Sequence, residues 1–225
     1  MLETRKEKIL GLIVDSYTQN AEPVGSKFLV EECGLEVSGA TVRNEMRDLE
    51  EQGYLTHPHT SSGRMPTEAG YEYYVENIMK VKDLSKKLQT ELERLKDNDK
   101  KQYLKILGKY IAEKTQSAVI VAFGEDSIYY TGISNLFSQP EFRDYAYTVS
   151  VSTIFDQVDE RIESVFELLN DKEPRVFIGQ KNPFGAMCGL VGGRLGDDAL
   201  FAILGPLRMD YLQGVSFVDY LQKSL

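Results

Sequence analysis

Apolar residues in the first eighty positions recur three or four residues apart, in short runs separated by turn-forming residues. Such spacing places them on one face of a helix. It predicts a helix beginning at Thr4, a second beginning at Ser26, and a third from Ser38 to Gly53. We expect Thr4 and Glu7 to form a capping box, and Ser26 and Ser38 to act as the N-caps of the next two helices.

The composition of residues 54–66 is not that of a helix. Residues 54–56 are a short β-prone run, and residues 57–66 are rich in proline, serine and glycine, which favour turns. A further apolar stripe at helical spacing then covers residues 67–79. Three helices, a hairpin and a closing helix together predict a winged helix-turn-helix domain over residues 1–80.

The remainder of the chain divides into a charged part and a part in which strands and helices alternate. Charged and long side chains dominate residues 81–116, which predicts a linker helix. The spacing of its apolar residues is compatible with a helical dimer interface, although Glu91 occupies a position where an apolar residue would be needed. Residues 117–225 predict an α+β domain with an antiparallel sheet. Its expected elements are strands at 118–123 and 127–131, a loop over 132–144, a helix over 154–169, a strand at 175–179, a hairpin of strands 190–195 and 199–204, and a last helix over 209–223.

The composition is that of a globular chain of one or two domains, with 225 residues, 42% of them hydrophobic. Its net charge of −9 argues against a non-specific nucleic-acid coat or a membrane-surface protein, because both depend on an excess of Lys and Arg. No apolar run is long enough to span a membrane and no secretory signal precedes the first helix, so we expect a cytoplasmic protein. Cys33 and Cys188 lie far apart without further ligands nearby, which predicts neither a disulfide nor a zinc site.

The third predicted helix carries the side chains best suited to reading DNA. Arg43 and Arg47 lie one turn apart and could reach guanine or phosphates, and Asn44 beside them could read adenine. The candidate contacts are Ser38, Thr41, Arg43, Asn44 and Arg47 in the major groove, His59, Thr60, Ser61 and Arg64 of the wing on the backbone or minor groove, and Lys27 on a phosphate.

The same helix also carries four acidic residues, Glu45, Asp48, Glu50 and Glu51, which would repel phosphates if they faced the groove. We expect them to point away from the DNA. Acidic residues also outnumber basic ones within residues 1–80. Affinity must therefore come from where individual charges and base contacts lie, and not from the total charge.

Other chemistry has weaker support. His57 and His59 are the only histidines in the sequence, and no carboxylate or thiolate follows at a spacing that suits a metal. No nucleophile–His–carboxylate set and no phosphate-binding loop is present, and the glycines of residues 189–196 do not match a dinucleotide loop. We therefore expect no metal, no cofactor and no enzymatic activity.

Six segments of the sequence resemble the HrcA family of heat-inducible transcription repressors. They are residues 22–26, 40–50, 58–67, 132–142, 192–194 and 205–211. The resemblance implies an N-terminal winged helix, a GAF-like domain, and repression of chaperone operons by a homodimer bound to an inverted-repeat operator called CIRCE. It also implies that the GroE chaperonin keeps the repressor active, and that unfolded protein produced by heat competes for the chaperonin.

The chain departs from the family in one respect. Family members usually carry a further dimerising domain inserted in the GAF-like part, whereas here only residues 124–133 span that interval. The chain therefore resembles a short form, in which the linker helix and the GAF-like sheet or terminal helix are candidate dimer interfaces. Two alternatives stay open: a regulator whose GAF-like domain binds a small effector, and a short paralogue that no longer dimerises.

Overall fold

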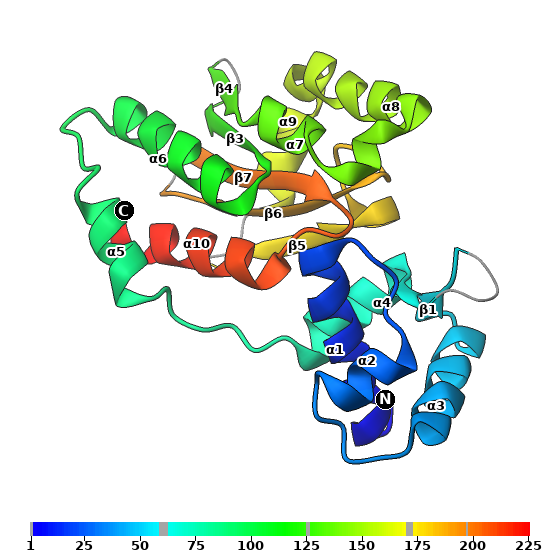
Figure 1. Cartoon of the computed structure of the whole chain (residues 1–225). Helices are drawn as coiled ribbons and strands as arrows, with labels where there is room; N and C mark the ends of the chain where they lie inside the picture. The colour runs from blue at the N-terminus through cyan, green and yellow to red at the C-terminus, as the bar shows by residue number, and fades with distance from the viewer. Residues whose placement is uncertain (1, 59–62, 125–126, 170–172, 197) are drawn as a thin grey trace. The chain divides into compact units, whose positions relative to one another are not determined.

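The computed structural model describes residues 2–58, 63–124, 127–169, 173–196 and 198–225. The chain divides into two compact units, Met1–Lys80 and Val81–Leu225 (Figure 1).

The first unit is built from helices and a small β-sheet. Its elements are α1 (Thr4–Asn20), α2 (Ser26–Glu31), α3 (Gly39–Glu51), β1 (Leu55–Thr56), β2 (Met65–Pro66), α4 (Glu68–Tyr73) and the π-helical turn η1 (Tyr74–Ile78). The apolar stripes meet in one core, with the side chains of Ile9, Leu10, Ile13, Leu29, Val42 and Leu49 fully buried. Burial of these side chains supplies the main stabilisation of the unit.

The first two helices begin at the predicted residues, Thr4 and Ser26, but two of the predicted N-caps do not form. Ser38 does cap α3, because its Oγ accepts a hydrogen bond from the Thr41 backbone N at 3.1 Å. The capping box at Thr4 does not form, since Thr4 is already the first helical residue and Glu3 at the N-cap makes no side-chain bond. Ser26 likewise lies inside α2, after Gly25. Both serine and threonine are tolerated in a first turn, so their presence alone does not fix the boundary.

Close backbone contacts shape the small β-sheet of the first unit, which corresponds to the predicted wing. β1 and β2 pair antiparallel, and Val24 adds a bridge to Arg64 through two backbone hydrogen bonds of 2.8 and 2.9 Å. A Cβ on Gly63 would lie 2.5 Å from the Val24 carbonyl carbon, and one on Gly70 would lie 2.2 Å from the Tyr54 carbonyl oxygen. These two positions accept only glycine without movement of the backbone.

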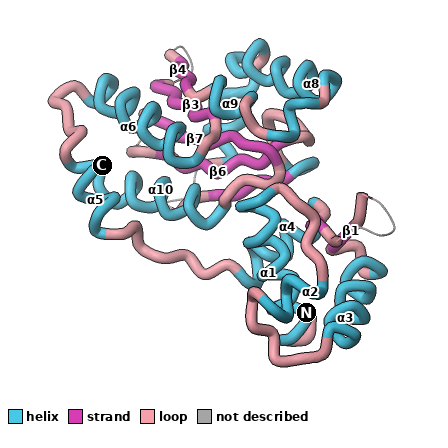
Figure 2. Tube along the Cα trace, viewed as in Figure 1, coloured by secondary structure: helices cyan, strands magenta, loops and turns pink. Residues whose placement is uncertain are grey.

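The second unit is a five-stranded sheet covered by helices on both faces (Figures 1 and 2). The strand order is β4-β3-β7-β6-β5, and every neighbouring pair is antiparallel. The strands are β3 (Ala118–Phe123), β4 (Ile128–Thr131), β5 (Arg175–Ile178), β6 (Cys188–Arg194) and β7 (Ala199–Pro206). The helices are α5 (Lys86–Glu93), α6 (Lys100–Thr115), α7 (Ile133–Phe137), α8 (Tyr145–Asp156), α9 (Val158–Leu168) and α10 (Tyr211–Ser224), with 3-10 turns at Pro140–Arg143 and Gly179–Lys181.

The central strands have no polar face because both of their faces are covered. Ile120 belongs to the core that also contains Val151 of α8 and Ile162 of α9. On the opposite face, Gly108 of α6 lies against Val119 and Val121. This explains why β3 is a continuous apolar run. In a strand with one solvated face, apolar and polar residues would alternate.

The structure corrects three predictions for the second half of the chain. The linker helix over 81–116 is two helices, because the side chains of Ser85 and Asp99 each cap a new one. The expected loop over 132–144 contains α7 and a 3-10 turn. The single helix over 154–169 is α8 followed by α9, with the break at Gln157. The first turns of α8 contain no charged residue and gave no periodic signal.

One ion pair joins two of the segments that resemble the HrcA family. Arg208, a buried residue after β7, donates from Nε to Glu141 Oε1 at 2.6 Å and from Nη2 to Gln139 Oε1 at 2.8 Å. The guanidinium therefore fastens the 3-10 turn after α7 to the loop that precedes α10. Arginine suits this position because its planar fork can satisfy two acceptors at once.

We predict that Gly70→Ala lowers the free energy of unfolding by about 1–3 kcal/mol, because the added methyl group would overlap the Tyr54 carbonyl oxygen. The matched control is Gly39→Ala in α3, where the nearest atom would lie 3.7 Å away. That change should be neutral or stabilising, since alanine favours a helix. Urea unfolding followed by circular dichroism checks both, and equal stability of the two variants would contradict the prediction.

Candidate nucleic-acid interface

One face of α3 presents polar and cationic side chains to solvent. Arg43, Asn44 and Arg47 are all exposed on this helix. At the beginning of α3, Ser38 Oγ and Thr41 Oγ1 lie 2.9 Å apart in a hydrogen bond. The structure therefore brings the five predicted groove contacts together on one helix and its N-cap.

Arg43 and Arg47 differ in how they are held. Arg43 Nε donates to Ser26 Oγ at 3.3 Å, which links α3 to the beginning of α2. Arg47 Nε lies 3.8 Å from Glu51 Oε1 on the same helix, and its side chain is 64% exposed. An exposed pair of this kind contributes little to stability and is easily exchanged for another anion. Both guanidinium groups are thus accessible to a phosphate or a base edge.

Three of the four acidic side chains on α3 are directed toward other elements of the first unit. Glu45 is buried and accepts a hydrogen bond from Arg5 Nε at 2.9 Å. Asp48 pairs with Lys6 at 3.1 Å, and this hydrogen bond raises the pKa of Lys6 above its ordinary value. Glu50 pairs with Arg64 at 2.9 Å and with His57.

Glu51 is the exception to the expected orientation, because its side chain is 70% exposed. It lies beyond Arg47 at the end of α3 and pairs with that residue. The expectation that the acidic residues point away therefore holds for Glu45, Asp48 and Glu50, and their negative charges are offset by cations from α1 and from the wing.

The remaining candidate DNA contacts lie outside α3 and its N-cap. His59, Thr60 and Ser61 fall outside the described residues. Lys27 on α2 is highly exposed and lies 3.8 Å from Glu31 on the same helix. Arg64 is half-buried, with its guanidinium against Glu50.

Two cations of α1 belong to the electrostatics of this surface although sequence reasoning did not select them. Arg5 and Lys6 precede the apolar stripe of α1 and resemble any solvated first turn. Only the packing of α1 on α3 places them beside Glu45 and Asp48. No signal in the local sequence marks these pairs, because the partners are about forty residues apart.

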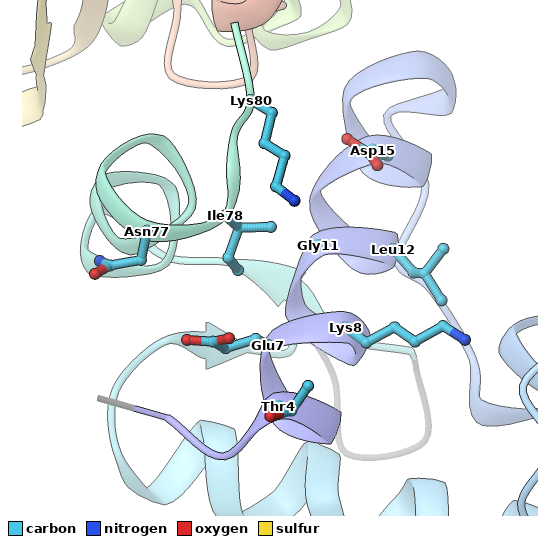
Figure 3. Close-up of a pocket in the computed structure, with 9 residues that line it drawn as sticks. All are labelled: Thr4, Glu7, Lys8, Gly11, Leu12, Asp15, Asn77, Ile78 and Lys80. Carbon is cyan, nitrogen blue, oxygen red and sulfur yellow. The ribbon is translucent and has the colours of Figure 1, made fainter.

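A pocket of about 360 Å³ lies in the same unit, between α1 and the segment that ends at Lys80 (Figure 3). Its lining carries charges of both signs, including Glu7, Asp15, Lys8 and Lys80. The two carboxylates already accept hydrogen bonds of 2.8 Å from the hydroxyls of Tyr73 and Tyr74. Both acidic groups of the lining are therefore already hydrogen-bonded within the first unit.

Within the described part of the chain, no three His, Cys, Asp or Glu side chains gather in a way that could hold a metal ion. The described helices also include none with the length and apolar character needed to cross a membrane.

Comparison with known proteins places the chain in a family. A sequence model described as the HrcA protein C-terminal domain matches residues 77–215, which is more than half of the chain. The chain belongs to the HrcA family. The predicted resemblance is thereby confirmed, and the family is one of transcription repressors and not of enzymes.

Two HrcA relatives, both named heat-inducible transcription repressor HrcA, show how much of the protein is shared. The relative from Cutibacterium acnes is 58% identical over 85 residues, which are 38% of this chain but only 25% of the relative. The relative from Desulforudis audaxviator is 27% identical over an alignment of 333 positions that covers all of this chain and 97% of the relative. Because this chain has 225 residues, that alignment leaves parts of the longer relative without a counterpart here.

A solved structure supports the fold of this HrcA-family chain. A crystal structure of a hypothetical protein aligns with a TM-score of 0.78 at 17% identity, over 99% of this chain and 97% of that one. The predicted fold class, α+β with an antiparallel sheet in the second part, is confirmed.

We predict that Arg5→Met lowers the stability of the first unit by about 1–3 kcal/mol, because it leaves the buried Glu45 carboxylate without its cation. The control is Lys27→Met, which removes a cation from an exposed pair within one helix and should cost less than about 0.5 kcal/mol. Urea unfolding of both variants measures the difference. Equal losses would show that the Arg5 pair does not stabilise α1 against α3.

Proposed function

We propose that this chain is a transcription repressor that binds an inverted-repeat operator of the CIRCE type as a homodimer and is released on heat stress. The observation that carries the proposal is the exposed face of α3, where Arg43, Asn44 and Arg47 are accessible while Glu45, Asp48 and Glu50 are directed elsewhere. The HrcA relatives, named heat-inducible transcription repressors, support the same assignment.

In this proposal α3 enters the major groove as the recognition helix. Arg43 and Arg47 contact guanine O6 and N7 or flanking phosphates, and Asn44 contacts adenine. Ser38 and Thr41 at the beginning of α3 also contact the major groove, and Lys27 on α2 contacts a phosphate. The wing, with His59, Thr60, Ser61 and Arg64, lies along the backbone or the minor groove.

The proposal includes a dimer because the two arms of an inverted repeat require two DNA-binding domains related by symmetry. Release on heating follows if the dimer or the DNA-binding unit loses its fold near the stress temperature, where a small domain loses stability over a few degrees. We propose the GroE chaperonin as the partner that maintains the active form, and the cytoplasm as the compartment, on the strength of the family resemblance.

The first test measures binding to a CIRCE duplex, a single half-site and a scrambled duplex at several salt concentrations, with light scattering to give the mass of each complex. We expect tight binding of two chains to the intact repeat, and weaker binding to the other two. Equal, weak and steeply salt-dependent binding to all three duplexes would contradict operator recognition, because it would reflect phosphate contacts alone.

Arg43→Ala should weaken binding to the operator by about 1–3 kcal/mol if its guanidinium makes a bidentate base contact. Binding to the scrambled duplex should then change little. The same titration measures both values. An equal loss on the two duplexes would instead identify Arg43 as a phosphate contact.

A further inference from the structure

A single carboxylate joins α3 to the residues that flank β1 and β2. Glu50 lies in the last turn of α3. Its Oε2 accepts a hydrogen bond of 2.9 Å from Arg64 Nε, and its Oε1 is paired with His57 Nδ1. His57 directly follows β1, and Arg64 directly precedes β2. Glu50 therefore contacts the residue next to each wing strand.

The backbone around Arg64 is fixed as firmly as its side chain. The Arg64 amide donates to Val24 O at 2.9 Å, and the Val24 amide donates to Arg64 O at 2.8 Å. Gly63 lies directly against the Val24 backbone, where a Cβ has no room. The Arg64 side chain is only 21% exposed, compared with 64% for Arg47 on the open face of α3. Its guanidinium is thus oriented toward α3.

We propose that Glu50 and Arg64 are positioning residues, which hold the wing against α3 so that both elements meet DNA as one preformed surface. This inference rests on the proposed DNA-binding function. This gives Arg64 a different role from the DNA contact proposed above, because its guanidinium acts through Glu50 and not on a phosphate. A preformed surface binds more tightly because the wing does not have to be ordered when the complex forms.

For the change in DNA affinity on removal of Glu50, the proposal predicts a loss where simple electrostatics predicts a gain. Removal of a negative charge from a DNA-binding unit should reduce repulsion from phosphates and strengthen binding. If Glu50 positions the wing, its removal should instead weaken binding to the operator. The neighbouring Glu51 provides a matched control, because it has the same charge, lies on the same helix and pairs with Arg47 and not with the wing.

The test compares the full-length chain with its Glu50→Ala, Arg64→Ala and Glu51→Ala variants and the Glu50→Ala/Arg64→Ala double variant, on the operator and scrambled duplexes. Alanine keeps the helix propensity of α3. We expect each Glu50 and Arg64 single variant to bind the operator roughly 5- to 50-fold more weakly, with the double variant no weaker than the singles because the two residues act as one unit. Glu51→Ala should bind as tightly as the unaltered chain, or more tightly.

Two further readouts separate positioning from a direct contact and from general destabilisation. The slope of log affinity against log salt should stay unchanged in Arg64→Ala, whereas loss of one phosphate contact would reduce it by about 0.9. Binding of Glu50→Ala to the scrambled duplex should be preserved, whereas partial unfolding would weaken binding to both duplexes equally. The proposal is overturned if Glu50→Ala binds the operator as tightly as the unaltered chain, or if Arg64→Ala lowers the salt slope by a full contact.

A measurement without DNA keeps this inference separate from the proposed function. In Glu50→Ala, the backbone amides of Val24 and Arg64 should exchange their hydrogens faster than in the unaltered chain, and in Glu51→Ala they should not. If the unaltered chain binds no operator but this difference appears, the proposed function fails while the link between Glu50 and the wing stands. Unchanged exchange in Glu50→Ala would overturn that link.

Discussion

The first unit depends on offsetting the negative charge of its helix α3. Glu45, Asp48 and Glu50 alternate along α3 with Arg43 and Arg47, so the helix has no overall positive character. Cations from other elements solve this problem: Arg5 and Lys6 come from α1, and Arg64 comes from the wing. Each of these pairs draws a carboxylate away from the face that carries Arg43 and Arg47.

These ion pairs also connect α1 and the β1–β2 hairpin to α3. α1 supplies much of the apolar core through Ile9, Leu10 and Ile13, and its first turn reaches the acidic side of α3. The wing is fastened to the other end of α3 through Glu50. Because the buried Glu45 carboxylate would be strongly unfavourable without its partner Arg5, the position of α3 is coupled to that of α1. A set of charges that is net acidic can in this way present a cationic surface locally.

The second unit holds its shape by a different means. Its sheet is buried on both faces, and Arg208 fastens the turn at Gln139 and Glu141 to the segment before α10. Several segments that resemble the HrcA family therefore occur where the backbone or a buried ion pair leaves little choice of residue: Gly63 against Val24, and Arg208 against Glu141.

The sequence by itself determined the elements with a strong period and the residues of the exposed helix face. The stripes of α1 and α3 were predicted because apolar residues repeat at helical spacing, and β3, β6 and β7 were predicted because each is a continuous apolar run bounded by turn residues. The motifs also identified the family. The predictions failed for α7, α8 and the linker, where short length, uncharged sequence or a local cap removed the periodic signal.

Only the tertiary structure decided how the charges of the first unit are paired. Glu45, Asp48, Glu50 and Glu51 look alike in the sequence, yet one is buried, two are half-buried against partners from other elements, and one is exposed. Ion pairing depends on distances between side chains that lie about forty residues apart, as in Arg5 and Glu45, and no local pattern encodes such a distance. The packing of α1 and of the β1–β2 hairpin on α3 sets these distances, and so decides which charges of α3 remain exposed.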